Sequence, residues 1–323
     1  MRFLIIGGTG FLGRQLSQMC LDADHEVTLF NRGQTNPSLF PDAEVLYGDR
    51  TKSLEVLQHR EWDVVIDTCG HFPKSVKQMV QELNSRVKQY IFISTCAVYA
   101  DLTQLNIDET HPVQKIDDSQ DPEASIPQTY GARKALCEAA VRENFEGVSL
   151  IIRPGIIVGE HDPSGRFTYW LLKVASQNRV VGPGSPKAPM QFIDARDLTK
   201  WIIHMASMRK GGTYNAVGPQ DETFTFESFL TLCQNVLNPE CQVKWVNDAI
   251  LKKANVRPWL DIPLWAPPPI SGIFSMNGNK AYSDGLSCRP ISETIGITYK
   301  WALFEEGTPS ESFLSSEEEE RFF

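Results

Sequence analysis

Several features that would place this chain in a binding or membrane class are missing from its sequence. Its seven cysteines are spread singly, with no C-x-x-C pair, which is unlike a zinc site or a disulfide framework. The N-terminal apolar run ends at Ile6, too early for a signal-peptide core or a membrane span. A basic excess is also missing, because the net charge is −9, which argues against nucleic-acid and anionic-membrane partners. We therefore expect a cytoplasmic protein with reduced thiols and no metal, nucleic acid or membrane.

The remaining composition is that of an ordinary enzyme. The chain has 323 residues, of which 41% are hydrophobic and 22% are charged. This length suits one large α/β domain with a smaller lobe appended to it.

Three evenly spaced glycines follow the short apolar run at the N-terminus. Gly7, Gly10 and Gly13 form G-x-x-G-x-x-G, and a helical pattern begins at Phe11. Glycine allows a sharp turn and a close ligand, and the amides at a helix start attract phosphate. Strand, glycine turn and helix together predict a dinucleotide pyrophosphate cradle. The residues we assign to it are Gly7, Thr9, Gly10, Phe11, Leu12 and Gly13.

Short apolar runs then alternate with helical patterns. This alternation predicts a Rossmann-type, doubly wound parallel sheet with helices on both faces and a ligand crevice at the carboxyl ends of the strands. The expected strands cover residues 3–6, 25–30, 43–47, 62–67, 90–94, 148–152 and 213–217, and the expected helices cover 74–83, 130–144 and 195–205.

The regular alternation of strand and helix patterns ends after Gly155. We expect a dinucleotide-binding domain over 1–160, to which a strand at 190–194 and its following helix return within about 188–218. Residues 161–187 and 219–323 then form a smaller α+β substrate lobe and tail. The acidic SEEEE near the end is expected to be a solvated terminus.

One long polar segment interrupts the N-terminal half. Residues 101–128 are acidic and carry three prolines, so this stretch cannot bury a core of its own. We expect a loop that becomes ordered when substrate binds.

Side chains suited to acid/base chemistry lie at the start of one expected helix and at the end of one expected strand. Tyr130 and Lys134 form Y-x-x-x-K, which places both on one helix face. A tyrosine pKa is normally about 10, and a nearby ammonium lowers it toward the range of a working acid/base. Thr95 follows an expected strand and can hydrogen-bond the same substrate oxygen, a role that neighbouring Ser94 could also take. We predict Thr95, Tyr130 and Lys134 as the catalytic set.

The end of the second strand indicates which cofactor is preferred. Asn31 and Arg32 stand where an NAD-binding chain would carry an acid. Without that acid a 2′-phosphate is not repelled, and Arg32 can clamp it. Arg50 would supply a second positive charge. We predict NADP, with NAD as the alternative.

Four motifs resemble the extended short-chain dehydrogenase/reductase superfamily: GGTGFLG, STCAVY, YGARK and RPGIIVG. Within it the chain resembles the NAD-dependent epimerase/dehydratase group. Its LFNRG and GDR motifs are similar to those of an atypical branch that includes chloroplast RNA-binding relatives. The resemblance implies NAD(P)-dependent hydride transfer on a small polyhydroxylated substrate, for which a nucleotide sugar is one candidate. It also implies cofactor contacts at Asp49, Cys69, Gly70, Ser94, Tyr130, Lys134, Pro154, Gly155 and Ile156.

Substrate contacts and partners remain more open. His161, Arg166 and Tyr169 lie where such a family meets its substrate. Trp259 and Trp265 belong either to the core of the lobe or to a homodimer contact. The rival class is a non-catalytic dinucleotide-binding protein, either an RNA-binding relative or a redox sensor.

Overall fold

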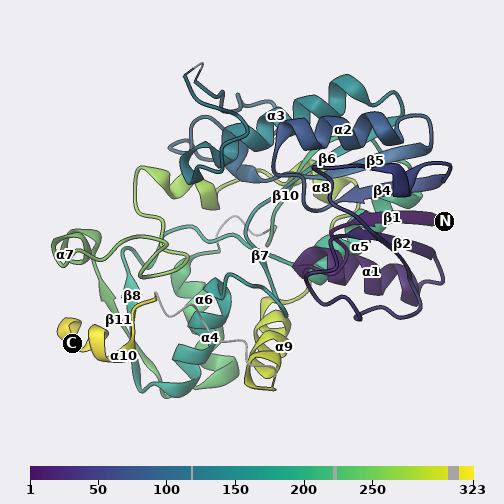
Figure 1. The fold of residues 1–323 in the computed structure, drawn as a ribbon. Helices are drawn as coiled ribbons and strands as arrows, with labels where there is room; N and C mark the ends of the chain where they lie inside the picture. The colour runs from purple at the N-terminus through teal and green to yellow at the C-terminus, as the bar shows by residue number, and fades with distance from the viewer. Residues whose placement is uncertain (118, 221–223, 305–312) are drawn as a thin grey trace.

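A parallel sheet of seven strands runs through the computed structural model, which describes residues 1–117, 119–220, 224–304 and 313–323 (Figure 1). The expected Rossmann-type α/β architecture is confirmed. In spatial order the strands are β10 (Gly212–Ala216), β6 (Val148–Pro154), β5 (Val87–Ile93), β4 (Trp62–Asp67), β1 (Arg2–Ile6), β2 (Glu26–Asn31) and β3 (Glu44–Tyr47).

Helices cover both faces of this sheet because successive strand residues point to opposite sides. In β1, Phe3 and Ile5 pack beneath α1 (Phe11–Asp22) and α5 (Ala195–Ser207). Leu4 and Ile6 pack on the other face, beneath α2 (Pro73–Leu83) and α3 (Tyr130–Asn144). Figure 1 shows the two helix pairs on either side of the sheet.

A smaller lobe beside the carboxyl edge of the sheet has its own aromatic core. Trp170, Phe229 and Trp265 are buried there, so Trp265 is a core residue, as one of the two alternatives expected. Besides the seven-stranded sheet and the four helices that cover it, the described residues form β7 (Ile157–Val158), α4 (Arg166–Ser176), β8 (Arg179–Pro183), β9 (Ile193–Asp194), α6 (Phe226–Leu237), β11 (Gln242–Val246), α7 (Asp248–Lys253), α8 (Asn279–Ser283), α9 (Ile291–Phe304) and α10 (Ser316–Glu319). Short 3₁₀ helices lie at Glu55–Leu57, Cys96–Val98, Pro127–Thr129, Ile270–Phe274 and Glu320–Phe322.

The prediction of a strand over 190–194 is wrong for most of its length. Only Ile193–Asp194 pair in a ladder, with β7. The amides of Met190 and Phe192 instead donate to the carbonyls of Phe224 and Gly218. The alternating pattern of this stretch therefore reflects burial in an irregular connection, which the same periodicity cannot distinguish from a strand.

The polar segment 101–128 is a loop, as expected, apart from the start of a 3₁₀ helix at Pro127; residue 118 lies outside the described residues. Its attachments include two β-bridges, one between Tyr99 and Val113 and another between Ile107 and Met276. Its ordering with substrate stays a prediction.

The acidic tail is only in part the solvated terminus that was expected, because Glu317, Glu318 and Glu320 are exposed but Glu319 is buried. Ser315 caps α10, and Glu319 at the end of that helix is 1% exposed. Its carboxylate lies 2.8 Å from Lys173 Nζ, and the same ammonium donates to the Leu314 carbonyl at 2.9 Å. The expectation failed for Glu319 because four successive glutamates look alike in sequence, whereas the helix turns one of them into the lobe.

We expect Glu319→Gln to lower the free energy of unfolding by about 3 kcal/mol, because it leaves the buried Lys173 ammonium without its counter-charge. Glu320→Gln is the matched control. Glu320 pairs with Arg179 at the surface, where an ion pair contributes about 0–1 kcal/mol. Urea unfolding of both variants measures the difference, and equal midpoints would contradict the assignment.

Candidate active site

The glycine turn after β1 is built by close backbone contact. Gly7 has φ +82°, and a Cβ at Gly13 would lie 2.1 Å from the Gly7 carbonyl oxygen. Both positions therefore need glycine. Gly10 is the N-cap of α1 and provides no side-chain cap, so the first amides of this helix are available to an anion. The residues present fit a dinucleotide pyrophosphate.

A cavity of about 950 Å³ lies along this turn and the neighbouring strand ends. Its size is within the range of ligand sites, which is about 300–1,000 Å³. Every residue assigned to the cofactor from sequence lines it except Gly70. The lobe contributes Arg166, Trp259 and Ile273 to its wall. The cavity thus spans both parts of the molecule.

Thr95 and Tyr130 come together in this cavity. Thr95 follows β5, and the amide of Ala97 donates to its Oγ1 at 3.1 Å. Tyr130 is the first residue of α3. Burial raises the pKa of the Tyr130 phenol, while its hydrogen bond with Thr95 opposes that rise. The expected lowering of the Tyr130 pKa by Lys134 is therefore absent from the chain by itself.

The contacts of the Lys134 ammonium explain why Lys134 does not lower the Tyr130 pKa. Its Nζ donates to the carbonyls of Gly70 and Ile93, both at 2.7 Å, and lies 4.1 Å from the centre of the Phe92 ring. Because the side chain is buried, desolvation lowers the Lys134 pKa from 10.5 to about 8. The ammonium is thus attached to the sheet edge, one helical turn from Tyr130.

This shift predicts a pH-dependent stability. Between about pH 8 and 10.5 the folded chain binds fewer protons at Lys134 than the unfolded chain, so the contribution of Lys134 to the free energy of unfolding rises with pH across this window, by about 3 kcal/mol in total. Lys134→Met should lose that rise. Urea unfolding of both cofactor-free proteins, from about pH 7 to about pH 11, measures the difference in slope. Parallel profiles would contradict the assignment.

The two arginines predicted to bind the 2′-phosphate, Arg32 and Arg50, differ in their partners. Arg32 is exposed at the cavity and makes no hydrogen bond to any described residue, and Asn31 Oδ1 accepts the Gly33 amide at 2.8 Å. Arg50 does not fit its predicted role. Its guanidinium donates to both oxygens of the buried Asp67 carboxylate at 2.7 and 2.8 Å, although β1 and β2 separate β3 from β4 in the sheet. Its charge is already neutralised there.

Of the three residues predicted to contact the substrate, two line a cavity and one does not. Arg166 lies 5.7 Å from the centre of the Trp259 ring at the cavity. His161 lines a neighbouring cavity of about 390 Å³, where its ring meets Trp301. Tyr169 is wrong as a substrate residue, since it is 6% exposed and its hydroxyl donates to the Leu314 carbonyl. Its helix turns it into the core of the lobe.

His71 and Trp259 are among the residues that line the cavity and that sequence reasoning did not assign to it. His71 follows Gly70 and has its pKa lowered to about 4 by desolvation and by Lys134. Trp259 was expected in the core or at a dimer contact. The alternative use of Ser94 is also wrong, because its hydroxyl donates to buried Glu138 at 2.6 Å.

The described residues contain neither a metal-binding cluster nor a membrane-spanning helix. Within that part of the chain, no group of three or more His, Cys, Asp or Glu side chains is placed to hold a metal ion. None of the helices there has the length and apolar content needed to cross a bilayer.

Comparisons with known proteins agree with this geometry. The model of the "NAD dependent epimerase/dehydratase family" matches residues 3–217. The chloroplast stem-loop binding protein of 41 kDa b from Arabidopsis thaliana is 32% identical over 114 residues, covering 30% of each chain. The dTDP-6-deoxy-L-talose 4-dehydrogenase (NAD(P)(+)) of Kitasatospora kifunensis is 23% identical over 172 residues, covering 50% of this chain and 54% of the relative. The chain thus matches only about a third to a half of the length of these relatives.

Solved structures resemble the whole chain at low identity. The Bordetella bronchiseptica enzyme WbmG in complex with NAD and UDP has a TM-score of 0.72 and 15% identity, with 98% of both chains covered. The UDP-Glc/GlcNAc 4-epimerase of Campylobacter jejuni has a TM-score of 0.69 and 13% identity, with 93% of this chain and 98% of that chain covered. At such identities the likeness concerns the fold.

Proposed function

Since the chain belongs to the NAD-dependent epimerase/dehydratase family, we propose that it is an NAD(P)-dependent oxidoreductase or epimerase acting on a hydroxyl-bearing carbon of a small polyhydroxylated substrate. The observation that carries the proposal is the meeting of Thr95, Tyr130 and Lys134 at one cavity with the glycine turn. A nucleotide sugar is the favoured substrate class, because the names of two similar proteins contain one. Residues 161–187 and 219–323 would bind it.

Each residue has a distinct task in this proposal. When bound along the glycine turn, a nicotinamide cofactor would supply the hydride acceptor or donor for the substrate carbon. The Tyr130 phenolate oxygen takes the proton of the substrate hydroxyl, or returns it in the reverse direction. Thr95 donates a hydrogen bond to the same substrate oxygen and limits its orientation. In the cofactor-bound enzyme, the positive charge of the nicotinamide would add to that of Lys134, one helical turn away, and the two together would favour the phenolate.

Tyr130→Phe should abolish turnover and leave cofactor binding nearly unchanged, because only the phenolic oxygen is lost. Losing a general acid/base costs about 10²-fold or more in rate. The assay follows reduced nicotinamide with UDP- and dTDP-hexoses, and fluorescence titration gives cofactor affinity. Tyr299→Phe is the control, since Tyr299 lines neither cavity. A Tyr130→Phe rate above a tenth of wild type would remove Tyr130 from this role.

We further propose that NADP(H) is preferred over NAD(H). Asn31 brings no negative charge to the ribose end of the cavity, and exposed Arg32 is placed to clamp a 2′-phosphate. With Arg50 committed to Asp67, the preference rests on Arg32.

Arg32→Ala should therefore weaken NADP(H) binding by about 10- to 100-fold and NAD(H) binding much less, since hydrogen bonds to charged groups contribute about 1.5–3 kcal/mol. Lys52→Ala removes a neighbouring exposed cation that does not line the cavity and serves as control. Dissociation constants for both cofactors measure the effect. Equal wild-type affinities for both, or equal losses in Arg32→Ala, would end the proposal.

A second candidate is an RNA-binding protein that holds a dinucleotide without turnover. It is favoured by the similarity to a chloroplast stem-loop binding protein, and the net charge of −9 weighs against it. Mass spectrometry of the purified protein would identify a retained cofactor or sugar nucleotide. Stem-loop RNA binding that weakens with salt, without hydride transfer on any nucleotide sugar, would favour this candidate.

A further inference from the structure

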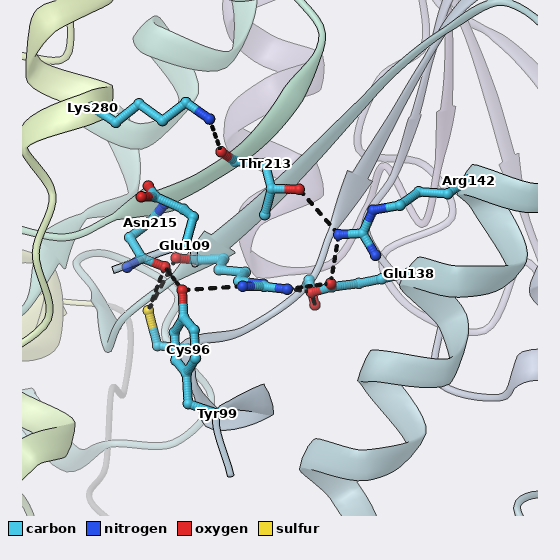
Figure 2. Close-up of polar contacts among 10 residues, drawn as sticks. Cys96, Tyr99, Glu109, Glu138, Arg142, Thr213, Asn215 and Lys280 are labelled. Carbon is cyan, nitrogen blue, oxygen red and sulfur yellow. Dashed lines mark hydrogen bonds and ion pairs between the residues drawn. The ribbon is translucent and has the colours of Figure 1, made fainter. Parts of the chain in front are cut away.

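Thr95 lies between two residues that are both attached to one buried polar network. On one side Ser94 Oγ donates to Glu138 Oε1 at 2.6 Å. On the other side the Cys96 thiol donates to the Arg153 carbonyl at 3.1 Å. Figure 2 shows Cys96, Tyr99 and Asn215 gathered at one end of this network and Glu138 at the other. The backbone is therefore held immediately before and immediately after Thr95.

Glu138 stands on the helix that carries the other reactive groups. It lies four residues after Lys134 and eight after Tyr130, a spacing that places all three along one side of α3. Lys134 donates to the Ile93 carbonyl, and Glu138 accepts from Ser94. The helix thus holds two successive residues of the strand end that leads to Thr95.

Arg153 joins this helix to the next strand and to the turn after Thr95. Its Nε and Nη2 donate to the two Glu138 oxygens at 2.9 and 2.7 Å, and its Nη1 donates to the Tyr99 hydroxyl at 3.1 Å. Tyr99 in turn donates to Asn215 Oδ1 at 2.5 Å. All four side chains are buried. The guanidinium therefore links α3 and β6 to the turn that follows Thr95, and through Tyr99 to β10.

We propose that Ser94, Glu138 and Arg153 are positioning residues that hold the Thr95 hydroxyl against Tyr130. The proposal rests on the function argued above for Thr95 and Tyr130. A buried ion pair is weak evidence for stability, because well-packed apolar side chains do as well. The pair instead fixes the geometry, because its bidentate hydrogen bonds allow only one arrangement of the helix and the strand end. A shift of about 1 Å between groups that share a substrate oxygen costs about 10²-fold in rate.

The network offers a matched control at its outer end. Arg142 donates to the same Glu138 carboxylate at 2.9 Å, and its side chain is 41% exposed. Figure 2 shows it bridging Glu138 and Thr213. Losing Arg142 removes one bond from Glu138 without touching Ser94 or Arg153.

The decisive variant is Ser94→Ala, which removes one hydroxyl and keeps the ion pair. We expect kcat to fall about tenfold, with KM and cofactor affinity within about twofold of wild type, because binding groups stay in place. A second readout needs no turnover. With 3-fluorotyrosine incorporated, the ¹⁹F resonance of Tyr130, assigned by Tyr130→Phe, should titrate at higher pH in Ser94→Ala, since the bond from Thr95 lowers the Tyr130 pKa.

Arg142→Gln should leave both readouts unchanged, and Glu138→Gln should move both in the direction of Ser94→Ala. If Glu138→Gln does not fold, Ser94→Ala still decides the matter. An unchanged Tyr130 titration in a folded Ser94→Ala protein overturns the proposal, as does an equal effect from Arg142→Gln. If the wild type turns over no substrate, the proposed function fails, while the titration still tests the positioning role.

Discussion

The contact between the Gly7 carbonyl and Gly13 sets where the large cavity can form. A Cβ at Gly13 would lie 2.1 Å from that oxygen, so α1 starts directly against the end of β1. The helix amides then point along the carboxyl edge of the sheet, where β2, β4 and β5 also end. A bulkier residue at Gly13 would push the helix away and separate its amides from the other strand ends.

Charged side chains are buried at several of these strand ends. Asp67 holds Arg50, Glu138 holds Arg153, and Lys134 is held by two carbonyls. Removing such charges from water is costly, and the low pKa of Lys134, about 8, records that cost. These groups are directional, and their bonds attach helices to strand ends at defined points. The edge that carries the reactive hydroxyls is thereby more strongly specified than apolar packing would make it.

Local patterns predicted the sheet, and they selected three residues, Thr95, Tyr130 and Lys134, that the fold brings to one cavity, because both depend on short-range rules. The glycine spacing, the alternation of strands and helices, and the separation of Tyr130 and Lys134 are all properties of neighbouring residues. The failures concern side chains whose partners are distant in sequence. Arg50 was assigned to a phosphate without knowledge of Asp67, and Glu319 was assigned to solvent without knowledge of Lys173. The pKa of Tyr130 in the cofactor-free chain likewise depends on its surroundings, because desolvation raises it while the hydrogen bond with Thr95 lowers it.

The sequence by itself determined the kind of fold, the place of the glycine turn and the position of Tyr130 and Lys134 on one helix, because period and spacing are properties of neighbouring residues. Only the tertiary structure decided which charges remain available. It committed Arg50 to Asp67, left Arg32 at the cavity, and placed Ser94 on Glu138 instead of on the substrate side. The reason is physical: whether a polar side chain reaches a ligand depends on which other groups burial brings within hydrogen-bond distance, and those groups come from elements far apart in sequence.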